Sequence, residues 1–294
     1  MCGIVGYVGK NNAQEFLLSG LKRLEYRGYD SAGVATLDQN QNPTLLRAVG
    51  KIVNLEAKIK DHYTSDHIGI GHTRWATHGN PSETNAHPHH VGSIFLVHNG
   101  IIENYKALKK ELSEKYQFKS ETDTEVLAAL IDSFYQESHD LLDSVTQALK
   151  LVSGTYGIAV MSADDTEHLV VARSGSPLVI GVGEHETLIA SDASALIGNT
   201  KNAIYLNDGE VALISRDHVE VKTLDLQPVS VKVEKILTDL SAIQKGGYDH
   251  FLLKEIMEQP NSLTETLRGR INQAEHTVHL GGPNLSAKEL KSIC

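Results

Sequence analysis

Cysteine is scarce in this chain, which has only Cys2 and Cys294 among its 294 residues. Two cysteines at opposite ends give no disulfide framework, and this fits a protein kept in a reducing compartment. No stretch approaches the roughly 18 consecutive apolar residues that a membrane-spanning helix needs. The N-terminus shows no basic region followed by a long apolar stretch, which argues against a secretory signal. These absences predict a cytoplasmic protein without a membrane partner.

Basic residues are in the minority. The chain has 27 lysines and arginines against 37 aspartates and glutamates, a formal net charge of −10. Because a surface that binds phosphate backbones needs an excess of cations, this balance disfavours a nucleic-acid partner. The apolar share of 40% is ordinary for a globular protein, and 294 residues suffice for one large domain or for one domain and a fragment.

Short β-rich runs recur between glycine, aspartate and asparagine residues. The clearest are GIVGYVG (3–9), IGIGHTRW (68–75), SIFLVHNG (93–100) and YGIAVMSA (156–163). A later pair, EVALIS and VEVKTL, is separated only by RDH and predicts a β-hairpin. Helical periodicity lies between the strand groups, at 12–28, 104–116 and 122–137. This segregation predicts an α+β fold in which helices cover antiparallel sheets.

The pattern changes after Leu226. A connecting segment is followed by two stretches with helical character, 250–260 and 261–271, and then by a polar remainder. About fifty residues cannot bury much core by themselves. We therefore predict three parts: a first domain at 1–226, a linker at 227–248, and the truncated start of a second domain at 249–294.

Cys2 directly follows the initiator methionine and precedes the first β-rich run. Removal of Met1 would leave an α-amine with a pKa of roughly 7.7–8.0 beside a thiol with a pKa of about 8.5. The amine can then take the thiol proton, directly or through one water, so the residue carries its own base. A thiolate is nucleophilic enough to attack an amide carbonyl. The alternative is a small buried residue at the start of a core strand.

A polar loop is expected at HTRWATHGNPSETNAHPH (72–89), directly after a strand. Arg74 offers a planar guanidinium that suits a carboxylate, and Trp75 is the only tryptophan of the chain. Seven histidines fall between residues 67 and 98, among them His87, His89 and His90. A metal site is therefore one alternative, but no acidic or cysteine partner stands at a recognised ligand spacing, so we expect no metal. A solvent-exposed surface loop is the other alternative, although it would leave the large apolar side chain of Trp75 without a role.

An Asn-Gly pair interrupts VHNGIIENY (97–105), where we expect a strand to end in a sharp turn before a helix. Such a turn can aim the Asn99 side-chain amide and the Gly100 backbone N–H at one point. Two donors that converge on a developing negative oxygen form an oxyanion hole, and each is worth on the order of 10²–10³ in rate. Glycine also lets a ligand approach the backbone closely. The alternative is an ordinary strand-to-helix turn.

The stretch SETDTE (120–125) opens a predicted helix. Thr122 and Glu125 stand at capping-box spacing. Asp123 is then left over in the first helical turn, where the helix dipole favours a carboxylate. It can hold a ligand ammonium group, and helix capping alone is the alternative.

Together these stretches resemble one family. They are CGIVGYVG, GLKRLEYRGYDSAG, GIGHTRWATHG, NAHPH, VHNGIIENY, SETDTE, ARSGSPL and KGGYDHFLLKEIMEQP. In order and spacing they resemble the glutamine:fructose-6-phosphate aminotransferases (isomerising), also called glucosamine-6-phosphate synthases, over essentially the whole chain. The resemblance implies a glutaminase domain of the N-terminal-nucleophile hydrolase class. Its fold is a four-layer αββα sandwich, two antiparallel sheets between helical layers.

The resemblance also implies a role for each candidate residue. Cys2, with its free α-amine as general base, attacks the side-chain amide of glutamine, and water then releases glutamate from the thioester. Asn99 and Gly100 form the oxyanion hole. The other implied residues are Arg74 for the substrate carboxylate, Asp123 for its ammonium, Thr77 and His78 in the pocket wall, Trp75 on a gating loop, and Arg27 as a support near the nucleophile. No cofactor is implied.

In this family a second half binds fructose 6-phosphate and aminates it with tunnelled ammonia, which gives glucosamine 6-phosphate for amino-sugar synthesis. Only the entry to that half, KGGYDHFLLKEIMEQP, is present here. We therefore expect this chain alone to hydrolyse glutamine at most, and the parent to form a homodimer through the missing half. Two alternatives stay open: a related N-terminal-nucleophile amidohydrolase with another amide substrate, and a catalytically silent glutamine-binding module.

Overall fold

The computed structural model describes four stretches of residues: 2–236, 247–267, 271–272 and 277–278. The chain divides into two compact units, residues 1–240 and residues 241–294. Within the described stretches, no helix is both long enough and apolar enough to cross a membrane.

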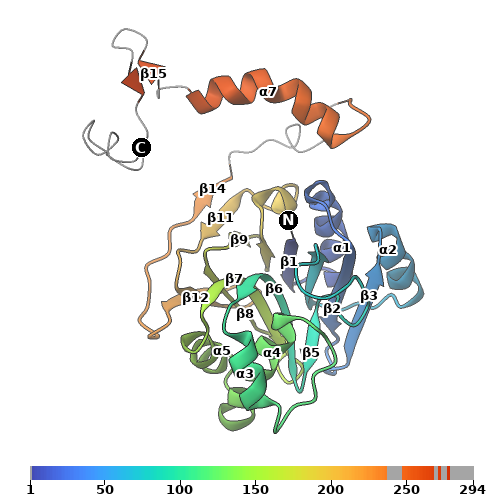
Figure 1. Ribbon diagram of the computed structural model, residues 1–294, viewed down its shortest axis with the longest axis vertical. Helices are drawn as coiled ribbons and strands as arrows, with labels where there is room; N and C mark the ends of the chain where they lie inside the picture. Colours follow the sequence, from blue (N-terminus) through green and yellow to red (C-terminus); the bar gives the residue numbers. More distant parts are fainter. Residues whose placement is uncertain (1, 237–246, 268–270, 273–276, 279–294) are drawn as a thin grey trace. The chain divides into compact units, whose positions relative to one another are not determined.

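Two antiparallel sheets form the first unit (Figure 1). The larger sheet, sheet A, has in order β14 (Glu234–Lys235), β11 (Asn202–Tyr205), β9 (Val179–Val182), β10 (Glu186–Ala190), β1 (Gly3–Gly9), β4 (Ile68–Arg74), β2 (Ser31–Leu37) and β3 (Pro43–Val49). The smaller sheet, sheet B, has in order β13 (Val219–Thr223), β12 (Glu210–Ile214), β8 (Leu169–Ser174), β7 (Gly154–Ser162), β6 (Ile94–Ile102) and β5 (His89–Val91). The predicted hairpin is confirmed as β12 and β13.

Helices cover the outer face of each sheet. They are α1 (Ala13–Arg23), α2 (Ile52–Asp61), α3 (Tyr105–Leu112), α4 (Asp123–Ser138) and α5 (Leu141–Lys150), with short 3₁₀ turns at Glu25–Arg27 and Ala193–Leu196. Helix α1 packs on β1 and β4, and α2 packs on β3. Helix α4 packs on β5 and β6, and α5 packs on β8 and β12. The four layers, helix–sheet–sheet–helix, confirm the predicted α+β fold with two antiparallel sheets.

The core between the sheets follows from strand alternation. Successive side chains of a strand point to opposite faces, so every second residue shares a face. Ile68 and Ile70 of β4 and Phe95 and Val97 of β6 belong to one buried cluster with Ile4 of β1. Each fully buried aliphatic or phenyl side chain contributes roughly 1.5–3 kcal/mol to folding. This cluster holds the two sheets face to face.

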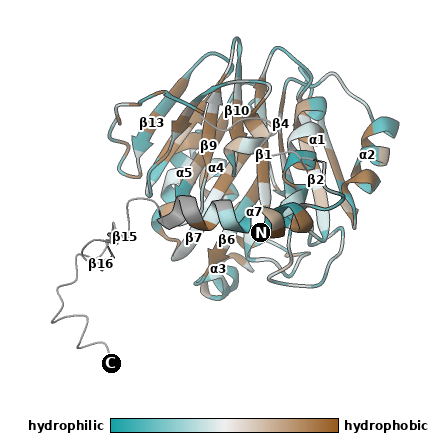
Figure 2. Ribbon diagram, turned by 90° about the horizontal axis from the view of Figure 1, so that it is seen from above, coloured by the Kyte–Doolittle hydropathy of each residue, from teal (hydrophilic) through white to brown (hydrophobic). Residues whose placement is uncertain are grey.

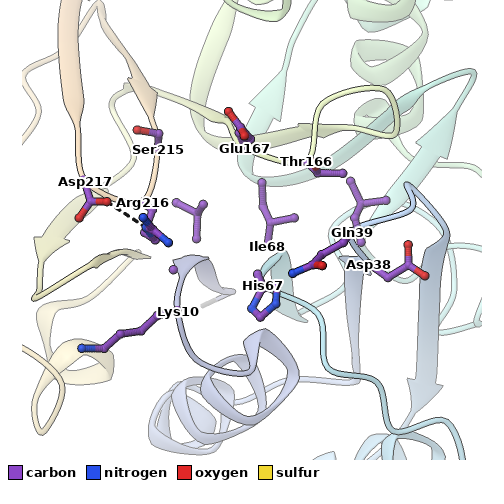
Figure 3. A pocket seen from close by; sticks show the side chains of 13 residues that line it. Lys10, Asp38, Gln39, His67, Ile68, Thr166, Glu167, Ser215, Arg216 and Asp217 are labelled. Atoms are coloured by element: carbon purple, nitrogen blue, oxygen red, sulfur yellow. Dashed lines mark hydrogen bonds and ion pairs between the residues drawn. The ribbon is translucent and has the colours of Figure 1, made fainter.

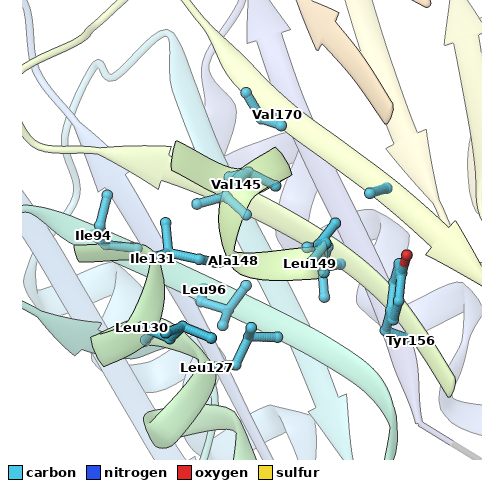
Figure 4. Close-up of a cluster of buried hydrophobic side chains, with 14 of the residues drawn as sticks. Ile94, Leu96, Leu127, Leu130, Ile131, Val145, Ala148, Leu149, Tyr156 and Val170 are labelled. Carbon is cyan, nitrogen blue, oxygen red and sulfur yellow. The ribbon is translucent and has the colours of Figure 1, made fainter. Parts of the chain in front are cut away.

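The other face of β6 packs against helices, as Figure 4 shows. Leu96 is fully buried there with Leu127 and Ile131 of α4 and Val145 of α5. Both faces of β6 are therefore covered, which is why the strand reads as a nearly continuous apolar run. Figure 2 shows much of the hydrophobic colour on the strands.

The observed helix bounds differ from the expected ones at two places in the first unit. The helix expected at 12–28 ends at Arg23, and the 3₁₀ turn at Glu25–Arg27 replaces its last turn. Gly28 then takes a φ of 79°, a left-handed conformation that ends the turn. The helix expected at 104–116 covers Tyr105–Leu112.

The second unit contains α7 (Phe251–Leu267) and a short antiparallel pair, β15 (Ile271–Asn272) and β16 (Thr277–Val278). The expectation of two separate helices at 250–260 and 261–271 is wrong, because α7 continues through Pro260. A proline removes one backbone donor and favours a break, but here the helix persists. Strand β14 pairs with β11, so chain beyond residue 226 takes part in the first unit. The domain limits 1–226, 227–248 and 249–294 stay a prediction.

Candidate active site

Cys2 lines a cavity of about 450 Å³. The side chains come from the start of β1, the turn after α1, the end of β4 with the loop behind it, the strand β6, and the start of α4. The lining includes all the residues singled out by the sequence: Cys2, Arg27, Arg74, Trp75, Thr77, His78, Asn99, Gly100 and Asp123. The fold thus brings together residues that are as far as 121 positions apart in the chain (123 − 2).

The cavity continues the inter-sheet core toward solvent. Cys2 stands two residues before Ile4, and Asn99 stands two residues after Val97. Ile4 and Val97 both belong to the apolar cluster between the sheets. Because strand side chains alternate, Cys2 and Asn99 point from sheets A and B toward the same space. An amide substrate would therefore meet the thiol on one side and the Asn99 amide on the other.

The Cys2 thiol is held against the backbone of Trp75. The Trp75 N–H donates to Cys2 Sγ over 3.2 Å, and Sγ lies 3.6 Å from the Trp75 carbonyl oxygen. Burial raises the pKa of the thiol above its ordinary value, although the Trp75 N–H acts in the opposite direction. A thiol with a raised pKa is protonated at neutral pH, so it needs a base close by before it can attack.

Asn99 and Gly100 lie inside β6 and not in a turn, so the expected strand-ending turn is wrong. The register of β6 with β7 runs unbroken through Asn99↔Gly157 and Gly100↔Tyr156 to Ile102↔Gly154. Gly100 takes a φ of 139°, and a Cβ atom there would lie 2.0 Å from the Thr155 carbonyl oxygen. Only glycine fits this position. The Asn99 Nδ2 donates to the Cys2 carbonyl oxygen over 3.3 Å, which places the amide beside the nucleophile.

Arg74 ties the loop after β4 around the cavity. Its side chain is buried, and its guanidinium donates to the carbonyl oxygens of His78, of Gly79 over 3.2 Å, and of Asn80 over 3.5 Å. The Asp30 carboxylate lies 3.9 Å away. The guanidinium therefore brings a positive charge to the cavity wall and also shapes the loop. The expected loop is confirmed at 75–88, whereas residues 72–74 belong to β4 and His89 begins β5.

Trp75 rests on a glycine. Its side chain is 55% exposed, and a Cβ atom on Gly28 would lie 2.4 Å from the indole Cζ3. The indole thus packs directly on the backbone of the turn that also carries Arg27. The Arg27 Nη1 donates to Ser191 Oγ over 3.3 Å, and that hydroxyl accepts from the Ile4 N–H over 3.0 Å. Arg27 is in this way linked to β1 two residues from Cys2.

Asp123 is buried at the first position of α4. One carboxylate oxygen accepts from the Ile102 N–H over 2.8 Å. The cap itself is Thr122, whose Oγ1 accepts from the Glu125 N–H over 3.3 Å. Thr122 therefore caps the helix, as predicted, but the Glu125 carboxylate accepts from the Lys119 and Ser120 N–H groups and does not complete the capping box. Asp123 lines the cavity.

Four buried histidines surround the site: His72, His87, His89 and His98. Burial lowers the pKa of His72 to about 3 and moves those of the other three below their ordinary value, so all are neutral near pH 7. Three of them bond to hydroxyl groups: His87 Nε2 and His98 Nδ1 lie 2.9 and 3.0 Å from Thr124 Oγ1, and His89 Nε2 lies 2.9 Å from Thr122 Oγ1. Across the described stretches, no group of three or more His, Cys, Asp or Glu side chains is placed to hold a metal ion.

The histidine pattern in the sequence points to His87 and His89 only as metal ligands and assigns no role to His72 or His98. Strand alternation carried a signal for His72, which stands two residues after Ile70 and so faces sheet B. No comparable sequence pattern marks His98 as part of the site, because its hydrogen-bond partner, Thr124, lies on α4 and not on a neighbouring strand.

A larger cavity of about 720 Å³ opens at the far end of β1 (Figure 3). A seven-residue strand spans about 20 Å, so this cavity is well separated from Cys2. Its lining carries charges of both signs: Lys10 and Arg216 are basic, and Asp38, Glu167 and Asp217 are acidic. The Arg216 Nε donates to Asp217 Oδ2 over 2.9 Å. None of the predicted site residues lines it.

The chain matches a known domain family and is similar to several curated proteins. A family model described as a glutamine amidotransferase domain matches residues 32–238. Glutamine–fructose-6-phosphate aminotransferase [isomerizing] from Chlorobaculum tepidum is 50% identical over 290 residues, 96% of this chain and 47% of that protein. The protein of the same name from Methanosarcina acetivorans is 47% identical over 305 residues, 100% of this chain and 49% of that protein. The chain thus spans about half the length of these curated relatives.

Solved structures agree in fold. Glutamine phosphoribosylpyrophosphate amidotransferase from B. subtilis, complexed with ADP and GMP, aligns with a TM-score of 0.66 at 27% identity, over 77% of this chain and 50% of that one. A structure described as the allosteric regulatory enzyme of purine biosynthesis aligns with a TM-score of 0.65 at 28% identity, over 76% and 49%. Two antiparallel sheets between helical layers are thus shared with amidotransferases of the N-terminal-nucleophile class.

Proposed function

Because the chain belongs to the glutamine amidotransferase domain family, we propose that the cavity beside Cys2 binds L-glutamine and that Cys2 hydrolyses its side-chain amide. The observation that carries this proposal is the convergence of unlike groups on one cavity. A thiol, a side-chain amide, a guanidinium and a carboxylate line it together. Each of these groups has a counterpart in glutamine.

The reaction begins at Cys2 after removal of Met1. The α-amine takes the thiol proton, and the thiolate attacks the amide carbon of glutamine. Negative charge moves to the carbonyl oxygen, where the Asn99 amide and the Gly100 N–H stabilise it. The C–N bond then breaks, the protonated amine returns its proton to the leaving nitrogen, and ammonia departs. Water next attacks the γ-glutamyl thioester with the amine again as base, which releases glutamate and restores the thiol.

The charged groups account for selection of an α-amino acid. Arg74 lies at the cavity wall with a planar guanidinium that can bind the substrate α-carboxylate. Asp123 presents a carboxylate for the α-ammonium. Thr77 and His78 complete the wall on the same loop, with Thr77 Oγ1 and His78 Nδ1 3.3 Å apart. Trp75 closes the loop over the substrate, and Arg27 supports the strand that carries Cys2.

The wider function follows from the relatives, of which this chain covers about half. We propose that a longer protein containing this chain passes the ammonia to a second half, which converts fructose 6-phosphate to glucosamine 6-phosphate. We further propose that this protein is cytoplasmic and forms a homodimer through that half. Transfer of ¹⁵N from amide-labelled glutamine to fructose 6-phosphate by the full-length protein would test the route. Unlabelled product would contradict it.

The test of the glutaminase proposal is release of ammonia and glutamate from glutamine. It uses this chain with Met1 removal verified by intact mass, beside a control that retains Met1. We expect turnover only in the processed chain, and none in Cys2→Ala, which should still bind glutamine by calorimetry. Turnover in Cys2→Ala would refute the nucleophile assignment. Binding without turnover in the processed wild-type chain would favour the silent module.

Two substrate analogues test the pocket assignments. Glutaramate lacks the α-amine that Asp123 would bind, and 4-aminobutanamide lacks the carboxylate that Arg74 would bind. We expect kcat/KM to fall about tenfold to a hundredfold for each, since a charged group left without its partner costs about 1.5–3 kcal/mol and each 1.36 kcal/mol is a factor of ten. Equal turnover of these amides would favour a related amidohydrolase with another substrate.

A further inference from the structure

The amide of Asn99 is held on two sides. Its Nδ2 lies 3.3 Å from the Cys2 carbonyl oxygen, and its Oδ1 lies 2.9 Å from His72 Nε2. His72 is fully buried in β4, and Asn99 is 9% exposed in β6. The contact therefore bridges sheets A and B at the cavity, 27 residues apart in the chain.

The donors and acceptors fix one arrangement. A backbone carbonyl oxygen can only accept a hydrogen bond, so the nitrogen of the Asn99 amide must face Cys2. The amide oxygen then faces His72, and this oxygen can only accept as well. His72 must therefore carry its proton on Nε2 and donate it to Asn99. Its other ring nitrogen, Nδ1, is buried and finds no partner within the described residues.

We propose that His72 is a positioning residue that holds the Asn99 amide with its N–H groups toward the carbonyl oxygen of the substrate amide. This inference rests on the proposed glutaminase function. The terminal torsion of an asparagine side chain is soft, and its two amide orientations differ by a half-turn. Without the His72 donor, the Asn99 amide can turn so that its oxygen faces the developing oxyanion. The partial negative charge of the Asn99 oxygen then repels the negative charge on the substrate oxygen. The hydrogen bond from His72 makes that orientation costly.

His72 can do this because its own ring is fixed. Its centroid lies 4.1 Å from the ring of His87, which is also buried. The His87 Nε2 in turn lies 2.9 Å from Thr124 Oγ1 on α4. The His87 ring, which bonds to the Thr124 hydroxyl, therefore packs against the His72 ring and keeps it oriented toward Asn99. A fixed supporting group of this kind lets a catalytic donor act without reorganisation.

The first experiment compares His72→Gln with His72→Asn. The glutamine side chain places its amide nitrogen as many bonds from Cα as His72 Nε2, so it can still donate to Asn99. The asparagine side chain stops one bond short. We expect His72→Asn to lower kcat about tenfold or more with KM within about twofold, and His72→Gln to restore most of the loss. Equal kcat in the two variants, or a change confined to KM, would overturn the proposal.

The matched control is His89→Asn, which truncates an equally buried histidine that bonds to Thr122 and does not line the cavity. We expect its kcat within about twofold of wild type. A loss as large as that of His72→Asn would mean that any disturbance of the histidine cluster suffices, and would overturn the specific role. Thermal unfolding of each variant verifies that it is folded.

A double-mutant cycle separates positioning from general damage. If His72 acts through Asn99, then His72→Asn should have less than about a threefold effect on kcat in an Asn99→Ala background. An undiminished effect there would refute the proposal. Failure of the glutaminase function itself would look different, because the processed wild-type chain would then show no turnover for any variant to reduce.

Discussion

Replacement of Gly100 by alanine should damage both stability and catalysis, because two independent costs meet at this position. The backbone has a φ of 139°, a conformation that is essentially confined to glycine. The new Cβ atom would lie 2.0 Å from the Thr155 oxygen and 2.7 Å from the Thr155 carbonyl carbon. Both are backbone atoms of β7, so they cannot move aside as a flexible side chain would.

The magnitude follows from these two costs. Strain at such a φ costs about 1–3 kcal/mol, and forcing an extra methyl group into a packed site costs about 1–3 kcal/mol more. We therefore expect Gly100→Ala to lower the free energy of unfolding by about 2–6 kcal/mol. Displacement of β7 would also shift Asn99, because Asn99 and Gly157 are directly paired. The kcat for glutamine should fall by about 10² or more, since oxyanion donors act only in the right place.

The control is Gly209→Ala. Gly209 also has a positive φ, 80°, but a Cβ atom there would meet nothing within 4 Å. It should show backbone strain alone, about 1–2 kcal/mol, with kcat unchanged. Urea unfolding followed by circular dichroism gives both free energies. If Gly100→Ala costs no more than Gly209→Ala, the account of the Thr155 contact is wrong.

Three further predictions concern the site and its support. Asn99→Ala should lower kcat by roughly 10²-fold with a smaller change in KM, and steady-state kinetics that showed only a KM effect would rule out the oxyanion role. Thr122→Ala removes the cap of α4 and should cost about 1–2 kcal/mol in urea unfolding, whereas an unchanged midpoint would mean that the cap contributes nothing. Burial lowers the pKa of His72 from 6.5 to about 3, so the folded state binds this proton less readily than the unfolded chain. The stability that neutral His72 contributes above pH 6.5 should therefore be lost as the pH falls toward 3, by up to about 1.4 kcal/mol per unit. Because the pKa values of His87, His89 and His98 are lowered as well, His72→Gln should reduce the slope of stability against pH, and not abolish it, in denaturant titrations at several pH values.

Local features of this protein were determined by the sequence alone. The cap of α4 is Thr122, whose hydroxyl accepts from the Glu125 N–H three residues later, and such short-range geometry is already present in one helical turn. The sequence also predicts the charge and the hydrogen-bonding type of each site residue, because a guanidinium, a carboxylate or a thiol keeps its chemistry wherever the fold places it. The segregation of strands and helices was enough to predict antiparallel sheets covered by helices, whereas the number of sheets and the four layers were implied only by the family resemblance.

The tertiary structure alone decided how those residues face one another. Asn99 and Gly100 read as a turn in isolation, yet pairing with β7, more than 50 residues later in the chain, keeps them in a strand. The sequence also did not show that β4 and β6 belong to different sheets whose faces meet. That packing brings His72 to Asn99 and Cys2 to the same cavity. Local preferences act over a few residues, whereas sheet pairing and burial join distant segments, so the orientation of the Asn99 amide exists only once both sheets have assembled.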